Sequence, residues 1–334
     1  MAGLLTQSSQ NIGGILPHTK SDYDWIRDRL RIITDLGTRV NDGGIVNEYS
    51  CHTALKLISV SYYSTIFSGI VRSPRQREMG YDGAVYVDLF AGSGLVKVRE
   101  TGDILAGSTI CAAANSHGFD YIISVEKDPD FKLALESRLA KVAPSGTFSV
   151  IEGDCNSCIS EVVRMIKRKF KNPIVLAFVD PEGMEIKLST LASLSKACPS
   201  TDFMINVTSG IPRVTGLFQK GNLSAGKTLE DYYNDDAVNI LAELELKSPE
   251  KKYQEQIGKI LGKKVGDTIP VVEKGDRLAY NILGYTRMTQ GGSRYAQSFS
   301  DIRKRFRNTD GEVVRNILDQ IHNRGIGSLT SFMS

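Results

Sequence analysis

The sequence VDLFAGSG, residues Val87–Gly94, decides the fold. Its first residues are hydrophobic and suit a buried strand, which ends at an acidic residue, Asp88. Gly92 and Gly94 allow the backbone to turn sharply and to approach a ligand closely. In an open parallel sheet, such a loop lies at the carboxyl edge of the strands, where nucleotide-like ligands bind. The stretch therefore predicts a ligand-binding loop after the first strand of an α/β sheet.

Two better-known glycine loops do not match this stretch. Lys97 stands where the third glycine of the dinucleotide fingerprint G-x-G-x-x-G is required, and no Gly-Lys-Ser/Thr follows as in a P-loop. A dinucleotide-dependent oxidoreductase is therefore disfavoured.

The chain alternates between strand and helix patterns from residue 84 onward. We expect strands at Ala84–Leu89, Tyr121–Glu126, Thr147–Ile151, Ile174–Asp180 and Asp202–Val207. We expect helices between them at Ser108–Ser116, Pro129–Val142, Ser157–Phe170 and Leu188–Ala197. This alternation predicts an α/β fold, a Rossmann-like parallel sheet with helices on both faces.

Additions flank this core, which we place at residues 81–215. Residues 1–17 read as a flexible leader and residues 18–80 as an N-terminal helical addition, with helices at Ser21–Leu36 and Tyr49–Val71. Residues 216–334 read as a mixed α+β extension that completes the sheet. Its expected helices are Thr228–Leu246, Lys251–Leu261 and Gly311–His322, and its expected antiparallel strands are Leu278–Thr286 and Arg294–Phe299.

An insertion separates the glycine loop from the first core helix. The segment LVKVRETGDILAG alternates around Thr101 and Gly102, which predicts a small hairpin. Ser108 follows and is expected to cap the delayed helix.

Composition sets broad limits on the class of protein. The chain has 334 residues, a net charge of +3, 41% hydrophobic and 24% charged residues, which is typical of a globular protein. Five cysteines favour a reducing compartment, and we expect no signal peptide and a cytoplasmic protein. The apolar stretch Leu55–Val71 contains a lysine and several serines, so we interpret it as a buried helix with no membrane partner. Cys155 and Cys158 form a lone C-x-x-C. We interpret both as ordinary thiols, and the lesser alternative is a zinc site or a redox role.

The glycine loop, read as DLFAGSG, resembles the first motif of Rossmann-like methyltransferases that use S-adenosylmethionine (SAM). This resemblance implies SAM as the cofactor. Acidic residues end or follow four expected strands: Asp88, Glu126, Asp154 and Asp180. By the same logic as in dinucleotide folds, Glu126 is expected to accept both ribose hydroxyls. Asp154 is expected to accept from the adenine amino group.

The predicted cofactor-binding set is therefore Asp88, Phe90, Ala91, Gly92, Gly94, Glu126, Asp154 and Asp180. The alternative for any one acidic residue is a loop residue that follows a strand.

Asp180 is the expected catalytic carboxylate. It begins DPEG, whereas amino-methylating enzymes commonly carry Asp/Asn-Pro-Pro-aromatic at this place. Glu182 and Gly183 replace the second proline and the ring, so methylation of a base is in question. Asp180 can orient an amine or bind the methionine ammonium, and the alternative is a simple turn.

Several phrases together resemble the three-Cys-motif partner (TcmP) family. They are HTALK at His52–Lys56, YVDLFAGSG at Tyr86–Gly94, TGDILAGS at Thr101–Ser108, VEKD at Val125–Asp128, GDCN at Gly153–Asn156, FVDPEG at Phe178–Gly183 and NVTSGIPR at Asn206–Arg213. The match covers about residues 50–215, with weaker agreement at Leu278–Arg287. It implies a methyltransferase-like core and a partner protein that carries the three cysteines, so Cys155 and Cys158 are not that motif.

Basic residues give the remaining candidates. Arg213 follows the fifth strand and is expected to bind an anionic group of the substrate, with a salt bridge as the alternative. The run Arg303–Arg307 can meet phosphates and, through Phe306, a base, the alternative being a solvated helix. We therefore expect a SAM-dependent methyltransferase that acts on an amine or another polar group of RNA or DNA. The alternative is a SAM-binding, catalytically silent partner subunit that recognises a protein or nucleic acid.

Overall fold

The computed structural model describes residues 21–208, 210–262, 264–275, 277–286 and 294–322, so the expected leader at residues 1–17 lies outside it. A seven-stranded sheet has the order β6-β5-β2-β7-β8-β10-β9. The strands are β2 (Gly83–Asp88), β5 (Tyr121–Glu126), β6 (Phe148–Glu152), β7 (Pro173–Val179), β8 (Thr201–Thr208), β9 (Lys264–Lys274) and β10 (Arg277–Thr286). The first five are parallel, and β10 runs antiparallel to both of its neighbours. The predicted fold class is confirmed.

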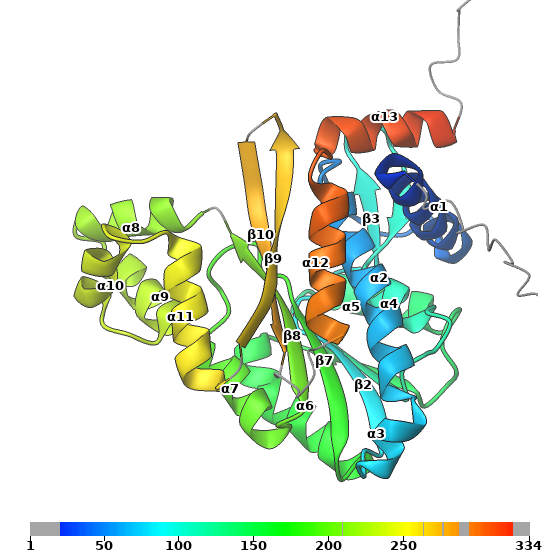
Figure 1. Ribbon diagram of the computed structural model, residues 1–334, viewed down its shortest axis with the longest axis horizontal. Coiled ribbons are helices and arrows are strands. Elements are labelled where there is room, and N and C mark those ends of the chain that lie inside the picture. The colour runs from blue at the N-terminus through cyan, green and yellow to red at the C-terminus, as the bar shows by residue number, and fades with distance from the viewer. Residues whose placement is uncertain (1–20, 209, 263, 276, 287–293, 323–334) are drawn as a thin grey trace, which may run out of the picture.

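Helices cover both faces of the sheet (Figure 1). One core lies under α1 (Asp22–Val40), α2 (Thr53–Val71), α4 (Ser108–Ala113), α5 (Pro129–Leu139), α12 (Arg294–Phe306) and α13 (Gly311–Ile321). The other lies under α6 (Cys155–Lys169), α7 (Leu188–Ala197) and the lobe formed by α8 (Ile211–Gln219), α9 (Leu223–Tyr233), α10 (Ala237–Leu244) and α11 (Pro249–Leu261). The central strands β2 and β7 are buried along their whole length, as expected where helices pack on both sides.

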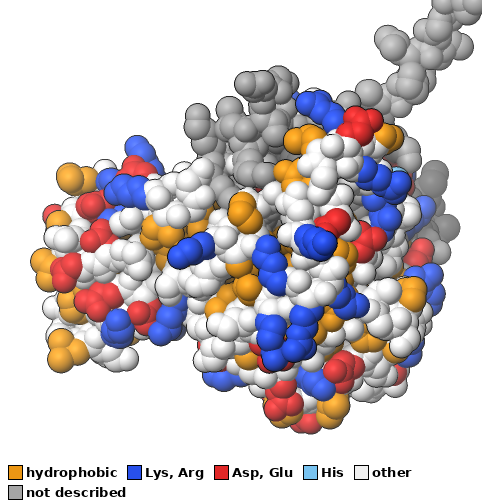
Figure 2. Space-filling view, turned by 90° about the horizontal axis from the view of Figure 1, so that it is seen from below, with side chains coloured by type: hydrophobic (Ala, Val, Ile, Leu, Met, Phe, Trp, Pro, Cys, Tyr) orange, Lys and Arg blue, Asp and Glu red, His pale blue; other side chains and the backbone are white. Residues whose placement is uncertain are grey.

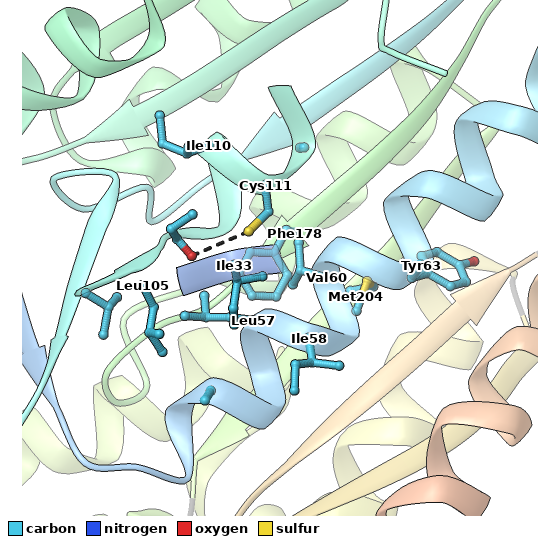
Figure 3. Close-up of a cluster of buried hydrophobic side chains, with 14 of the residues drawn as sticks. Ile33, Leu57, Ile58, Val60, Tyr63, Leu105, Ile110, Cys111, Phe178 and Met204 are labelled. Atoms are coloured by element: carbon cyan, nitrogen blue, oxygen red, sulfur yellow. Dashed lines mark hydrogen bonds between the residues drawn. The ribbon is translucent and has the colours of Figure 1, made fainter. Parts of the chain in front are cut away.

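Helix α2 forms the centre of one core. Figure 3 shows its residues Leu57, Val60 and Tyr63 beside Phe178 of β7 and Met204 of β8. By length and composition α2 is apolar enough to cross a membrane, but 67% of its apolar window is buried inside the protein. A helix that is hydrophobic on all sides is expected to be buried in this way.

A second, three-stranded sheet lies beside the glycine loop. It has the order β1-β3-β4, with β1 (Asn47–Tyr49), β3 (Leu95–Val98) and β4 (Ile104–Ala106). The predicted hairpin is confirmed as β3–β4, whereas Tyr49 lies in strand β1 and not in the expected helix. The N-cap of α4 is Gly107, so the expected cap at Ser108 is wrong; the Ser108 hydroxyl donates to Asp88 instead.

The C-terminal extension differs from its prediction in three ways. The expected helix at residues 228–246 is two helices, because Asn234 adopts φ 52° and Asp236 caps α10. The expected strand at residues 294–299 belongs to helix α12, in which Phe299, Ile302 and Phe306 are buried at helical spacing. The partner of β10 is β9, which contains a proline and lies at the edge of the sheet.

The linker between the N-terminal addition and the core, at residues 72–80, contains a short helix, α3 (Pro74–Glu78).

Candidate functional site

A cavity of about 570 Å³ lies at the carboxyl ends of the parallel strands. The loops after β2, β5, β6 and β7 form most of its wall, and residues of β1, α2, β3 and the start of α4 complete it. The lining residues used below are Asn47, Tyr49, Lys56, Phe90, Ala91, Gly92, Gly94, Glu126, Lys127, Asp128, Asp154, Cys155, Asp180, Glu182 and Glu185. The size and the place are those of a small-molecule site in an open α/β sheet.

The glycine loop is fixed by bonds from both sides. Gly92 has φ +61° and donates its N–H to Glu126 Oε2 at 2.7 Å. The next N–H, that of Ser93, donates to Asn47 Oδ1 at 2.8 Å. A Cβ at Gly92 would stand 2.7 Å from the same Asn47 oxygen, so no other residue fits without a shift. The loop therefore joins the end of β5 to the N-terminal addition.

Glu126 ends β5 and lines the cavity. Its Oε1 accepts the N–H of Asp128 at 2.8 Å and its Oε2 accepts that of Gly92. A carboxylate has about four acceptor positions, so each oxygen can accept one further bond from a ligand. The two backbone bonds hold the carboxylate in one orientation.

Asp154 caps helix α6 and lines the same cavity. Its Oδ1 accepts the N–H groups of Asn156 at 2.9 Å and Ser157 at 3.3 Å. The Asn156 amide in turn donates to the Glu185 carbonyl at 2.9 Å, so the loops after β6 and β7 are tied together. The predicted pair Glu126 and Asp154 thus lies on neighbouring strand ends.

Asp88 lies beneath the loop and does not line the cavity. Its side chain is fully buried and accepts hydroxyl bonds from Ser108 at 2.6 Å and Thr109 at 2.9 Å. The Phe90 N–H also donates to it, at 3.3 Å. Burial raises the pKa of Asp88 to about 6, although these hydrogen bonds act in the opposite direction. The residue anchors the glycine loop and the start of α4.

Asp180 follows β7 and is held by two protein groups. Its Oδ2 lies 2.6 Å from the Lys56 ammonium, and its Oδ1 accepts from the Asn206 amide at 2.8 Å. The ammonium also lies over the rings of Tyr280 and Tyr49, at 5.1 and 5.8 Å from their centroids.

The sequence interpretation missed the part of the cavity wall that comes from the N-terminal addition. Asn47, Tyr49 and Lys56 come from the N-terminal addition and not from the core. Tyr49 donates its hydroxyl to Glu182 at 3.0 Å, and burial raises the pKa of Tyr49, which keeps it a donor. A lysine inside an otherwise apolar helix was the signal that could have identified Lys56.

Arg213 does not belong to this wall. It is exposed on α8 and is absent from the described residues that line the cavity. Its predicted role toward the substrate therefore has no geometric support here.

Two of the four basic residues in the run Arg303–Arg307 are paired with other parts of the protein. Arg303 pairs with Asp267 at 3.0 Å, and Arg305 pairs with Asp22 at 3.1 Å. Phe306 is 4% exposed, so the expected contact of its ring with a base is wrong. Figure 2 shows Lys and Arg side chains spread over one face with Asp and Glu among them, and hydrophobic side chains on the outer part of the α8–α11 lobe.

The two cysteines of the C-x-x-C differ in their surroundings. Cys155 is buried against the cavity, and burial raises its pKa to about 12, whereas Cys158 is half-buried. Over the residues that the structure describes, no group of three or more His, Cys, Asp or Glu side chains is placed to hold a metal ion.

Comparison with known protein families gives no match, and comparison with curated protein sequences gives none either. Among solved structures, the chain is similar to a Legionella pneumophila protein described by the family model DUF519. The TM-score is 0.41 and the identity 12%, over 80% of this chain and 92% of that chain. It is also similar to the O-methyltransferase from Bacillus cereus in complex with SAH, with TM-score 0.38 and 12% identity over 82% and 94% of the two chains. A third is M. jannaschii TYW2 in complex with AdoMet, with TM-score 0.33 and 12% identity over 64% and 75%.

Proposed function

We propose that this protein is a SAM-dependent methyltransferase. The observation that carries the proposal is the placement of Glu126 and Asp154 on one side of the glycine loop and of Asp180 on the other. The strand order β6-β5-β2-β7 fixes this arrangement, because the loop follows β2. An elongated ligand that crosses the loop meets carboxylates at both of its ends.

The chemistry of these groups fits SAM. Glu126 has free acceptor positions for two ribose hydroxyls, and Asp154 has a second oxygen for the adenine amino group. When bound, SAM supplies a methyl group on a sulfonium, which passes to a lone pair of the acceptor. Asp180 stands at the far side of the loop, where it can orient the acceptor or the methionine end.

The charge of the cavity supports a cationic ligand. Of its ionisable lining residues, the acidic ones are Glu126, Asp128, Asp154, Asp180, Glu182 and Glu185, and the basic ones are Lys56 and Lys127. A cleft with an excess of carboxylates attracts positive charge and favours sulfonium over the neutral sulfide that is left after transfer.

For the acceptor, we propose an amine or another polar group of a nucleic acid. Asp180-Pro181 supplies the first half of the Asp-Pro-Pro-aromatic pattern, and Tyr49 adds an aromatic ring to the same cavity from β1. One observation favours a catalytically silent, SAM-binding subunit as the second candidate. Both Asp180 oxygens already have protein partners, Lys56 and Asn206, which compete with an acceptor amine.

Calorimetry with SAM, S-adenosylhomocysteine (SAH) and NAD tests the cofactor. We expect SAM and SAH to bind and NAD not to bind. Glu126→Ala should weaken binding by about 1–3 kcal/mol, because ribose hydroxyls lose a buried acceptor. Glu152→Ala is the matched control, since Glu152 pairs in register with Glu126 on the neighbouring strand but is exposed outside the cavity. Binding of NAD in place of SAM, or equal affinities of both variants, would contradict the proposal.

Methyl-labelled SAM, incubated in parallel with RNA, DNA and protein, tests the acceptor. We expect label in nucleic acid with the parent protein and none with Asp180→Asn. Normal SAM binding with no label in any fraction would support the silent subunit instead. Label in the protein fraction alone would reject nucleic acid as the acceptor.

A further inference from the structure

Lys56 reaches the ligand cavity from α2, in the middle of an apolar core helix. Its side chain is only 9% exposed, and its ammonium forms an ion pair with Asp180 at 2.6 Å. A buried ion pair is costly to desolvate, and it is retained most readily where both charges have further partners. Both residues of the pair line the cavity, so a ligand can provide those partners.

Each member of the pair has unused bonding capacity. The ammonium has three donors, of which one meets Asp180, while Tyr280 and Tyr49 present ring faces and not oxygen atoms. The carboxylate accepts from Lys56 and from Asn206, which leaves about two of its acceptor positions. The pair therefore offers the cavity a positive donor and a negative acceptor side by side.

We propose that Lys56 and Asp180 together bind the α-amino acid end of SAM, an inference that rests on the proposed function. The Lys56 ammonium binds the α-carboxylate, and Asp180 binds the α-ammonium. An α-amino acid carries opposite charges on groups attached to one carbon, which matches an adjacent lysine and carboxylate in head-to-tail order. Every charge then keeps an opposite neighbour, and no charge is left buried and unpaired.

The position of the pair in the sheet agrees with this assignment. Asp180 follows β7, on the opposite side of β2 from Glu126 and Asp154, where the adenosine end is assigned. Asn47, on the same N-terminal addition as Lys56, contacts the glycine loop that lies between the two ends. An acceptor amine alone would need only Asp180 and would leave the Lys56 ammonium unexplained. The N-terminal addition is thus a part of the cofactor site.

The test compares SAH with 5′-methylthioadenosine, which lacks the amino acid end, by calorimetry on the full chain. We expect the parent protein to prefer SAH. Lys56→Met should lower the affinity for SAH by about tenfold to a hundredfold and change that for methylthioadenosine by less than about twofold. Lys127→Met, which removes the other lysine of the cavity, should leave the ratio of the two affinities unchanged.

Lys56→Met leaves Asp180 without its cation and can fail to fold. The double variant Lys56→Met/Asp180→Asn removes both charges and keeps the pocket filled, and it should lose the preference for SAH as well. Thermal unfolding of each variant confirms that it is folded before binding is measured.

Three results would overturn the inference. The first is an equal loss of affinity for SAH and for methylthioadenosine in the Lys56 variants. The second is an unchanged preference for SAH. The third is a loss of turnover at unchanged SAH affinity, which would place Lys56 on the acceptor side. If the folded parent protein binds neither SAH nor methylthioadenosine, the proposed function itself fails, so the two failures are distinguishable.

Discussion

Asn47 Oδ1 accepts the N–H of Ser93 at 2.8 Å and so joins strand β1 to the glycine loop, 46 residues further along the chain. The same oxygen lies where it would meet a Cβ at Gly92. The shape of the loop is therefore set by the N-terminal addition as well as by the strand that precedes it. This contact leads to the first prediction.

Gly92→Ala should destabilise the protein by about 2–4 kcal/mol and weaken SAM binding. The positive φ of 61° costs an alanine about 1–2 kcal/mol, and its Cβ would meet Asn47 Oδ1 at 2.7 Å. Gly43→Ala is the matched control, because Gly43 has φ 74° with nothing within 4 Å of its Cβ position. Urea unfolding measures both. Equal losses in the two variants would show that backbone strain, and not the contact with Asn47, determines the effect.

Asp88→Asn should change the pH dependence of stability. Burial raises the pKa of Asp88 to about 6 from 3.8, so the folded protein binds this proton more tightly than the unfolded chain does. The resulting stabilisation is fully present below pH 3.8 and is lost as the pH rises through about 6. A shift of about two units corresponds to about 3 kcal/mol.

Urea unfolding of parent and Asp88→Asn at a series of pH values checks this sign. Between about pH 4 and about pH 7.5, the free energy of unfolding of the parent should fall by about 3 kcal/mol relative to that of the variant. Contributions from other carboxylates cancel in the difference. A constant difference across this range would show that Asp88 stays ionised in the folded protein.

Arg138→Met should destabilise the protein by about 3 kcal/mol. The Arg138 side chain is fully buried, donates to the Ser93 carbonyl at 2.8 Å and pairs with Asp42 at 2.7 Å. Its loss removes a hydrogen bond that holds the glycine loop and leaves the Asp42 carboxylate without its cation. Arg164→Met removes an exposed pair with Glu161 and should change stability by less than about 1 kcal/mol. Thermal unfolding distinguishes the two, and similar effects would argue against a special role of Arg138.

Lys304 and Arg307 are exposed members of the basic run Arg303–Arg307, and neither forms an ion pair with a residue that the structure describes. They carry what remains of the expected phosphate contact. If these two residues bind phosphates of a nucleic acid, replacing both with Gln should weaken binding to duplex DNA. The slope of log affinity against log salt should then fall by about 0.9 for each lost contact. Replacement of Arg164 and Lys167, exposed on α6, is the control. A filter-binding salt series with identical slopes in parent and variant would reject this surface.

The core of the fold could be predicted because its elements carry local signals. Strand β5 and helix α7 begin and end at the expected residues. In this part of the sequence, strand and helix patterns alternate and clear turn residues separate them. The hairpin at Thr101 and Gly102 was predictable for the same reason. Strand β9 was not predictable, because it contains Pro270 and its two ends are charged, so its sequence lacks a clear strand pattern. Its place at the edge of the sheet is set by its pairing with β10.

The candidate site was predictable only where it depends on strand ends. Glu126, Asp154 and Asp180 meet at one edge because parallel strands all end there. Asn47 and Lys56 come to that edge from the N-terminal addition. Asn47 lies in β1, a three-residue strand without a sequence pattern, and its position depends on the pairing of β1 with β3. Asp88 shows the reverse case: its place in the sequence suggested a ligand contact, but Ser108 and Thr109 occupy it from α4.

The position of β10 between β8 and β9 has a consequence for the newly synthesised chain. Strand β8 leaves the ribosome well before residues 277–286, with the α8–α11 lobe between them. Until β10 arrives, the edge of β8 has no hydrogen-bonding partner there, and the apolar side chains Phe203 and Ile205 lie along it. Open edges of this kind recruit other chains. Substitutions that slow the docking of β10 should therefore appear first as aggregation of nascent protein and dependence on chaperones, before any change in the finished site.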